Sequence, residues 1–161
     1  MARLLQVTRP AAIALLATTG FAALPATARA GECPADRVVA DSNRAVETQP
    51  RGVTDDVLAS VDLAKEPAAV QNRLLRLRRL VVQPGGVVPW HSHGMRPAII
   101  YIVEGEITEY ASTCAVPIDH RAGEATVERN PTQHWWRNNG SRPAVLLSAD
   151  FFPVADDPHM M

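Results

Sequence analysis

The stretch GGVVPWHSHGMRPAIIYIVEGE, residues 85–106, decides the fold of this chain. It opens on a glycine pair that predicts a turn, and it continues into a β-branched, aromatic run over residues 98–103. Between them stand His91 and His93, and side chains two residues apart project from one face of a strand, so both imidazoles can share an ion. Imidazole binds divalent metals well, but a single H-x-H pair is weak evidence, so other residues must complete a site.

Short strand-like segments lie on both sides of this stretch. The segment before it ends at an expected turn, Pro84-Gly85-Gly86, and residues 106–112 return after the 98–103 strand as the second arm of a hairpin. Further short strands between proline and glycine turns are expected at residues 123–130, 132–136 and 144–152. Many short strands at a spacing of ~10 residues, without a helical period, indicate an all-β sandwich or barrel.

Two features of the preceding segments leave alternatives open. Residues 53–63 suit either a short helix or a strand, and the acidic pair Asp55-Asp56 near their start favours a helical turn. The arginines at positions 76, 78 and 79 of the following strand either line a cavity or form an outward, solvated face. We expect the outward face, with Leu75 and Leu77 pointing inward.

The first thirty residues have the organisation of a secretory signal peptide. Arg3 and Arg9 precede a short apolar run, and Ala28 and Ala30 place small residues at positions −3 and −1 of a cleavage site. An uncleaved anchor or a buried helix is the alternative, but the run is shorter than the ~20 residues that span a bilayer, so no stable membrane anchor is expected. We expect a periplasmic or secreted chain with a signal peptide over residues 1–30, an N-terminal arm over 31–66, a β-barrel domain over 67–153 and a tail over 154–161.

Net charge and cysteine content limit the classes of partner and the state of the thiols that we expect for this chain. Cleavage after Ala30 leaves 13 basic and 17 acidic residues, a formal charge of about −4, which argues against nucleic acid or an anionic membrane as a partner. The two cysteines, Cys33 and Cys114, permit one disulfide in an exported chain, and the alternative is a pair of free thiols. The disulfide would tie the N-terminal arm to the barrel.

His134 is the natural third metal ligand. It stands in RNPTQHWWRNNG, residues 129–140, beside two tryptophans, where a buried histidine needs a hydrogen bond or a ligand. The alternative is a histidine that packs against the tryptophans and bonds to a backbone carbonyl. Of the other histidines, His120 lies in a polar hairpin and His159 in the tail, and neither stands out.

Two sequence motifs, in order and at a matching separation, resemble those of the cupin superfamily. The first joins a glycine, an H-x-H pair and a closing glycine, at Gly85, His91, His93 and Gly105. The second is matched at Gly123, His134 and Asn138, whereas Arg129 and Pro131 replace its proline and second glycine. The resemblance covers roughly residues 73–152. It implies a small antiparallel jelly-roll β-barrel with a divalent metal inside and, as a family-level expectation, a homodimer.

The sequence departs from the cupin pattern at one position. The usual glutamate ligand of the first motif falls at Ala98, and an alanine side chain cannot bind a metal. The interpretation that we favour is a three-histidine site formed by His91, His93 and His134, since all three imidazoles are kept. Some cupin dioxygenases that act on thiols or diketones use such neutral triads for iron. A site without the glutamate would leave more positive charge on the ion and favour anionic substrates.

Two further interpretations of the missing glutamate remain open. In one of them another carboxylate substitutes for the lost one, and Glu109 on the return strand is a better candidate than Glu104 or Glu106, which flank the Gly105 turn. Otherwise the barrel is degenerate and binds a sugar or metabolite without a metal.

The resemblance implies a secreted metal-binding cupin, and we expect an iron-type, O2-dependent oxygenase with a small-molecule substrate. Fe(II) is the first choice of metal, ahead of Mn, Ni, Cu and Zn, and no catalytic residue is assigned. The rival function is a non-catalytic cupin that binds a small metabolite. Arg96 is a candidate positive partner for a carboxylate unless Pro97 turns it to solvent. The other candidates for a substrate pocket, which otherwise serve as barrel packing, are Tyr101, Trp90, Trp136 and Asn138.

Overall fold

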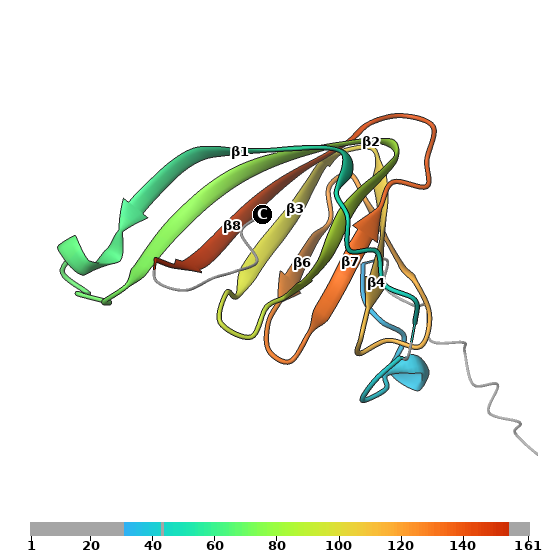
Figure 1. The fold of residues 1–161 in the computed structure, drawn as a ribbon, viewed down its shortest axis with the longest axis horizontal. Helices are drawn as coiled ribbons and strands as arrows, with labels where there is room; N and C mark the ends of the chain where they lie inside the picture. The colour runs from blue at the N-terminus through green and yellow to red at the C-terminus, as the bar shows by residue number, and fades with distance from the viewer. Residues whose placement is uncertain (1–30, 43, 155–161) are drawn as a thin grey trace, which may run out of the picture.

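The computed structural model describes residues 31–42 and 44–154, and these consist almost entirely of antiparallel strands (Figure 1). The elements are η1 (Ala35–Arg37), β1 (Arg51–Asp62), η2 (Leu63–Lys65), β2 (Arg73–Ser92), β3 (Ala98–Glu104), β4 (Glu106–Ala111), β5 (Ile118–Arg121), β6 (Ala125–Glu128), β7 (Gln133–Arg137) and β8 (Ala144–Pro153). The all-β class is therefore confirmed. The expected signal peptide lies outside the described residues, within which no helix is long and apolar enough to cross a membrane.

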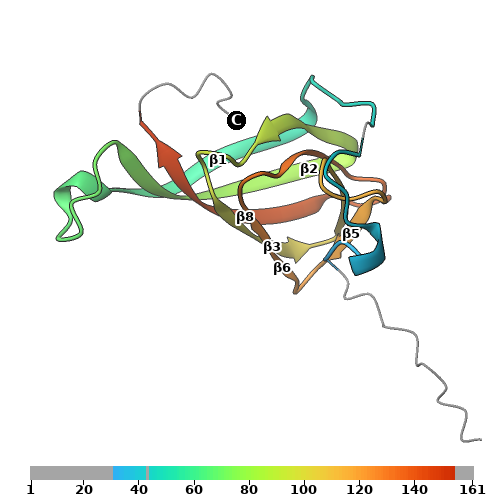
Figure 2. The same cartoon turned by 90° about the horizontal axis from the view of Figure 1, so that it is seen from below.

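The strand β2 joins the two halves of one curled sheet (Figures 1 and 2). The order of the strands is β5-β4-β7-β2-β8-β3-β6, and β1 also pairs with β2. Residues 73–82 of β2 pair with β8, whereas residues 87–92 pair with β7. The expected chain reversal at Pro84-Gly85-Gly86 is wrong, because β2 continues through these residues while it changes partners.

The segment expected to favour a helical turn is instead the strand β1. It pairs antiparallel with β2 over most of its length, so residues 51–62 of the expected N-terminal arm belong to the sheet. The acidic pair does not cap a helix, because Asp55 forms an ion pair with Arg78 across the ladder. Long-range pairing therefore overrides the local signal. In Figure 1, β1 and β2 project past β8 as a two-stranded arm that ends in η2.

The side chains of β2 point to the opposite faces of the sheet from those expected from the sequence. Arg76 and Arg78 point inward and are largely buried, whereas Leu75 and Leu77 lie exposed on the outer face. Because the side-chain period of a strand is two, a shift of one residue exchanges the two faces completely. The inward arginines are tolerated since the carboxylate of Asp150 on β8 lies within ion-pair distance of both.

The apolar core lies on the concave side of the curled sheet. Alternate residues of β3 face it, so Ala98, Ile100 and Ile102 are buried while the residues between them are exposed. The other members of this cluster are Leu80, Val82, Val88, Ile107, Trp136, Ala144 and Leu146. Each fully buried aliphatic side chain contributes roughly 1.5–3 kcal/mol, so the core holds together the strands that carry the polar side chains described below.

A disulfide between Cys33 and Cys114 attaches the N-terminal segment to the β4–β5 connection. The Cα atoms are 5.8 Å apart and the two residues are separated by 81 positions in the sequence. Cys114 packs in a second small apolar cluster with Ala111 and Ile118. Of the two alternatives for the cysteines, the structure forms the disulfide.

Gly105, between β3 and β4, leaves no room for a side chain. Its φ is +77°, and an added Cβ would lie 2.5 Å from the carbonyl oxygen of Pro143. We expect Gly105→Ala to lower the free energy of unfolding by about 3 kcal/mol or more, because a left-handed backbone costs about 1–2 kcal/mol and the clash adds to that.

The matched control for this prediction is Gly123→Ala. Gly123 has a φ of +91° but nothing within 4 Å of an added Cβ, so only the backbone cost of about 1–2 kcal/mol is expected. Urea denaturation of both variants measures the difference. Equal losses of stability would contradict the role given to the close approach of Pro143.

Candidate metal centre

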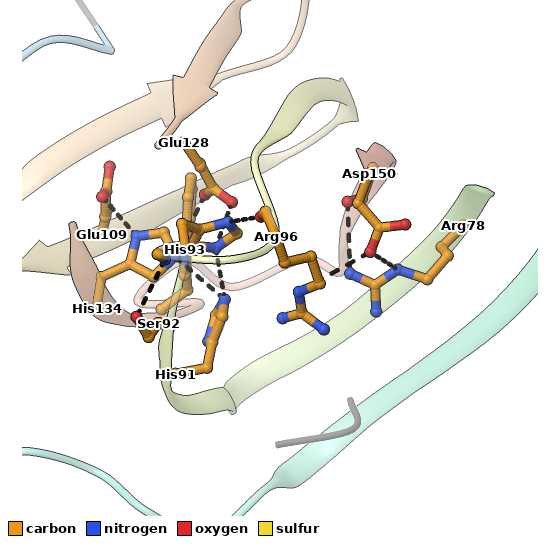
Figure 3. Close-up of polar contacts among 12 residues, drawn as sticks. Arg78, His91, Ser92, His93, Arg96, Glu109, Glu128, His134 and Asp150 are labelled. Atoms are coloured by element: carbon orange, nitrogen blue, oxygen red, sulfur yellow. Dashed lines mark hydrogen bonds and ion pairs between the residues drawn. The ribbon is translucent and has the colours of Figure 1, made fainter. Parts of the chain in front are cut away.

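Three imidazoles and one carboxylate converge on a single point on the inner side of the sheet (Figure 3). His91 comes from β2, His93 directly follows β2, His134 comes from β7, and Glu128 ends β6. One ligand atom from each residue lies within 4.8 Å of all the others. His91 and His134 are direct partners in the β2–β7 ladder, so the sheet itself brings two distant histidines together.

The Nδ1 atom of each histidine is held by an oxygen outside this point. His91 Nδ1 lies 2.8 Å from the carbonyl oxygen of Pro89, and His93 Nδ1 lies 2.8 Å from that of Arg96. His134 Nδ1 lies 2.6 Å from a carboxylate oxygen of Glu109. Because these oxygens only accept, each Nδ1 donates its proton, which leaves a lone pair on each Nε2 that faces the common point. The indole Nε1–H of Trp136 donates to His134 Nε2 at 3.4 Å, a long hydrogen bond that a metal at this point would replace.

The distances between the facing atoms suit a bound ion. His91 Nε2 lies 3.0 Å from His93 Nε2 and 3.2 Å from His134 Nε2. The Glu128 oxygens lie 2.9 Å from His93 Nε2 and 3.5 Å from His134 Nε2. Ligands about 2.0–2.2 Å from an ion stand roughly 3–3.5 Å from one another. Lone pairs this close repel unless a cation or proton lies between them, so the four side chains fit a divalent metal.

The protonation of the cluster supports the same assignment. Burial, followed by the repulsion of His134 and His93, lowers the pKa of His91 well below its ordinary value. Burial also acts to lower the pKa of His134, but the negative charges of Glu128 and Glu109 outweigh it and raise this pKa. The raised pKa makes His134 hold a proton more readily than an ordinary histidine, and a metal that binds its Nε2 would compete with that proton.

Glu109 holds the His134 ring at Nδ1, on the side opposite the converging Nε2 atoms. Its two oxygens lie 2.6 Å from His134 Nδ1 and 3.0 Å from His120 Nε2, and all three side chains are buried. Burial acts to raise the pKa of Glu109, but the hydrogen bonds from His120 and His134 lower it to about 2. Glu109 is therefore an ionised carboxylate that orients a ligand. The suggestion that it substitutes for the missing ligand is wrong, since it lies on the Nδ1 side of the ring.

Glu128 was not among the residues expected from the sequence to belong to the site. Its strand was expected, but nothing in the sequence alone shows which residue lies opposite Ala98. In the β3–β6 ladder the direct partner of Ala98 is Glu128, so the carboxylate absent from one strand is supplied by its neighbour. Glu104 and Glu106, at the turn between β3 and β4, are exposed and do not belong to the cluster of candidate metal ligands.

A small cavity adjoins the cluster, with a volume of about 30 Å³. It is lined by His91, Glu128, Trp136 and Arg96, among other residues, and Arg96 is only 3% exposed. The structure therefore turns Arg96 inward rather than to solvent.

The remaining pocket candidates do not line this cavity. Tyr101 is 44% exposed and belongs to the outer face of β3, and Trp90, whose backbone nitrogen donates to the Glu47 carbonyl, is half-buried outside the lining. The side chain of Asn138 is buried and bonds to the backbone oxygens of Val82 and Arg142. Its contacts hold the β7–β8 connection.

Comparison with known proteins shows which family model and which solved structures this chain resembles. A family model described as the cupin domain matches residues 78–150. The germin-like protein subfamily 2 member 2 of Arabidopsis thaliana is 34% identical over 76 residues, which make up 45% of this chain and 35% of that protein. The chain spans about a third of the length of the curated relatives that it matches.

Two solved structures share the fold at low sequence identity. The Cupin_2 domain of an XRE family transcriptional regulator from Enterobacter cloacae aligns with a TM-score of 0.50 and 13% identity, over 64% of this chain and 99% of that chain. A protein described as a predicted oxalate decarboxylase from Thermotoga maritima aligns with a TM-score of 0.50 and 17% identity, over 66% of this chain and 93% of that one. Residues 78–150 of this chain therefore match a cupin domain, and the curled sheet has the jelly-roll fold that these two structures share.

The buried pair formed by Glu109 and His134 leads to a prediction for metal affinity. We expect Glu109→Gln to weaken the binding of a divalent metal about 10–100-fold, the usual effect of removing the partner that orients a histidine ligand. Competition with a chromophoric chelator measures the affinity. The control is Glu106→Gln, an exposed glutamate on the same strand, which should leave it unchanged. Equal affinities for Glu109→Gln and the unmodified chain would contradict the orienting role.

Proposed function

We propose that this chain is an exported, metal-dependent cupin enzyme that uses O2 to oxidise a small molecule. The observation that carries the proposal is the convergence of three imidazole Nε2 atoms and one carboxylate beside a small cavity. A purely structural histidine cluster has no need to turn three Nε2 atoms and a carboxylate toward one point.

The candidate ligands include the carboxylate of Glu128 in addition to the three histidines expected from the sequence. Imidazole nitrogens combined with one carboxylate suit Fe(II), and they also accept Mn, Ni, Cu or Zn. Such an ion, when bound at a site with open positions, can take both O2 and a substrate and promote electron transfer between them. Because Glu128 contributes one negative charge, the net charge of the loaded site falls to +1 rather than +2.

Other residues of the chain line the cavity and orient the candidate ligands. Ile100, Leu146 and Trp136 form an apolar wall beside His91. Glu109 and the backbone oxygens hold each imidazole in the orientation that ligation requires. No described residue of the cavity is assigned as a general base, so the chain supplies binding and orientation.

Export is part of the same proposal. The signal peptide expected over residues 1–30 would deliver the chain to an oxidising compartment, where a disulfide persists. The bond between Cys33 and Cys114 supports this location.

Metal analysis followed by O2 uptake tests the proposed function. The chain from Gly31 onward is loaded anaerobically with Fe(II), and O2 consumption is followed with panels of small organic acids, thiols and diketones. We expect about one ion per chain, its loss in His91→Ala/His134→Ala, and O2 uptake with at least one panel. One ion per chain without uptake from any panel would favour the alternative function, a metal-stabilised cupin that binds a small metabolite.

A further inference from the structure

The segment that begins at Gly31 is attached to the β4–β5 connection and to β5 by several contacts. Cys33 forms the disulfide with Cys114, and Val38 forms a β-bridge with the same residue. The backbone nitrogen of Gly31 donates to the carbonyl oxygen of Asp119 on β5 at 3.0 Å. Figure 2 shows this segment beside β5, which ends the strand order of the sheet. Gly31 is therefore held by residues that follow it in the chain.

The backbone of Gly31 lies directly beside one imidazole nitrogen and one carboxylate oxygen. Gly31 is buried and its φ is +83°. An added Cβ would lie 3.3 Å from Nδ1 of His120 and 3.4 Å from Oε2 of Glu124. The same Oε2 accepts from the backbone nitrogen of Arg121 at 2.8 Å, which fixes the position of the carboxylate.

The imidazole nitrogen beside Gly31 has no hydrogen-bond partner among the described residues. His120 is fully buried, and its Nε2 lies 3.0 Å from a carboxylate oxygen of Glu109. Because a carboxylate only accepts, Nε2 carries the proton, and Nδ1 of the neutral ring then presents a lone pair. A buried acceptor without a donor destabilises a fold, so a donor at this place would stabilise it.

Cleavage of the expected signal peptide after Ala30 would supply such donors. Hydrolysis of the Ala30–Gly31 bond consumes one water, leaves a carboxylate on Ala30 and frees an amino group on Gly31. As an amide, the Gly31 nitrogen has one proton, which the carbonyl oxygen of Asp119 accepts. As an ammonium it has three, and a free α-amino group is mostly protonated at neutral pH. Two N–H donors and one positive charge are thereby added beside His120 and Glu124.

We propose that the amino group freed at Gly31 binds in this place as an ammonium. It donates to the carbonyl oxygen of Asp119, to the carboxylate of Glu124 and to Nδ1 of His120. The proposal rests on the export part of the proposed function, namely cleavage after Ala30, and does not depend on the oxygenase chemistry.

This amino-terminal site is connected to the candidate metal centre. Glu109 accepts from His120 through one oxygen and from the candidate ligand His134 through the other. An amino group bound at Nδ1 of His120 extends this series of hydrogen bonds to the first residue of the exported chain. Processing therefore acts on the support of a metal ligand.

Two chains that differ by one residue test the proposal. The first begins at Gly31. The second begins at Ala30, so that its amino group lies one residue farther away and the Gly31 nitrogen is an amide. We expect the chain from Gly31 to have a thermal midpoint roughly 3–8 °C higher, and the ¹⁵N resonance of His120 Nδ1 to differ between the two chains. An equal midpoint or an equal resonance would overturn the proposal.

Substitution of the carboxylate locates the site. In Glu124→Gln the difference in midpoint between the two chains should fall by about half or more, because the amide oxygen still accepts from Arg121 but has no negative charge. Glu32→Gln, at the exposed glutamate that follows Gly31, should leave the difference unchanged. Circular dichroism checks that both variants fold. Equal effects of the two substitutions would show a general attraction between charges and overturn the assigned site.

Expression of all 161 residues in a host that exports the chain tests the processing step. The mass of the exported chain should correspond to a start at Gly31, and any other start would overturn the proposal.

The O2 uptake of the metal-loaded chain from Gly31 separates this proposal from the proposed function. A difference in midpoint without O2 uptake from any panel would leave the amino-terminal site standing and remove the oxygenase. O2 uptake together with equal midpoints of the two chains would remove the amino-terminal site and leave the oxygenase.

Discussion

Glu128→Ala should abolish tight metal binding, and Ala98→Glu in the same chain should restore it. Removal of Glu128 takes away the only carboxylate among the four converging side chains. We expect the affinity for a divalent metal to fall more than about 100-fold, since the loss of even a residue that only orients a ligand costs about 10–100-fold.

The restoration follows from the position of the two residues in the sheet. Ala98 and Glu128 are direct partners in the β3–β6 ladder, and Ala98 is buried on the inner face. The Cβ atoms of such partners are about 4.5–5.5 Å apart, within the reach of a glutamate side chain. A glutamate at either position can therefore present its carboxylate to the same three imidazoles.

Metal content and competition with a chelator measure both effects. The double variant Ala98→Glu/Glu128→Ala should bind metal within about tenfold of the unmodified chain, because the ligand set is the same. The control is Glu104→Ala, which removes an exposed glutamate at the end of β3 and should change nothing. Unchanged affinity in Glu128→Ala would show that the three histidines suffice. Loss of affinity in both Glu128→Ala and the double variant would show that the position of the carboxylate is not exchangeable.

Asp150→Ala should destabilise the fold by about 3–5 kcal/mol, the range seen when one partner of a buried ion pair is removed. The substitution removes the carboxylate that lies within ion-pair distance of Arg76, Arg78 and Arg96. Urea denaturation of the metal-free chain measures the loss without a contribution from metal binding.

The control for this prediction is Asp56→Ala. Asp56 lies beside Asp55 on β1 and forms an ion pair with Arg79 at 3.9 Å, in which both side chains are more than half exposed. Exposed pairs contribute about 0–1 kcal/mol, so the loss should be small. A loss for Asp150→Ala that is no larger than for Asp56→Ala would mean that water or an anion already compensates the arginines.

Local patterns explain why part of the candidate site could be predicted. The spacing of His91 and His93 requires both to lie on one side of a strand, and His134 stands among tryptophans in a second strand. The β-branched and aromatic composition of residues 98–103 and the spacing of the expected turns lead to an all-β fold. These features depend on neighbours in the chain, which the sequence displays directly.

The sequence by itself determined most strands of the sheet, the three candidate histidine ligands and the absence of the usual glutamate at Ala98. Only the tertiary structure decided that Glu128 lies opposite Ala98, that residues 51–62 form a strand, and that Arg76 and Arg78 point inward. The physical reason is common to all three. Each depends on the register between strands distant in sequence, and a shift of one residue would turn these side chains to the other face.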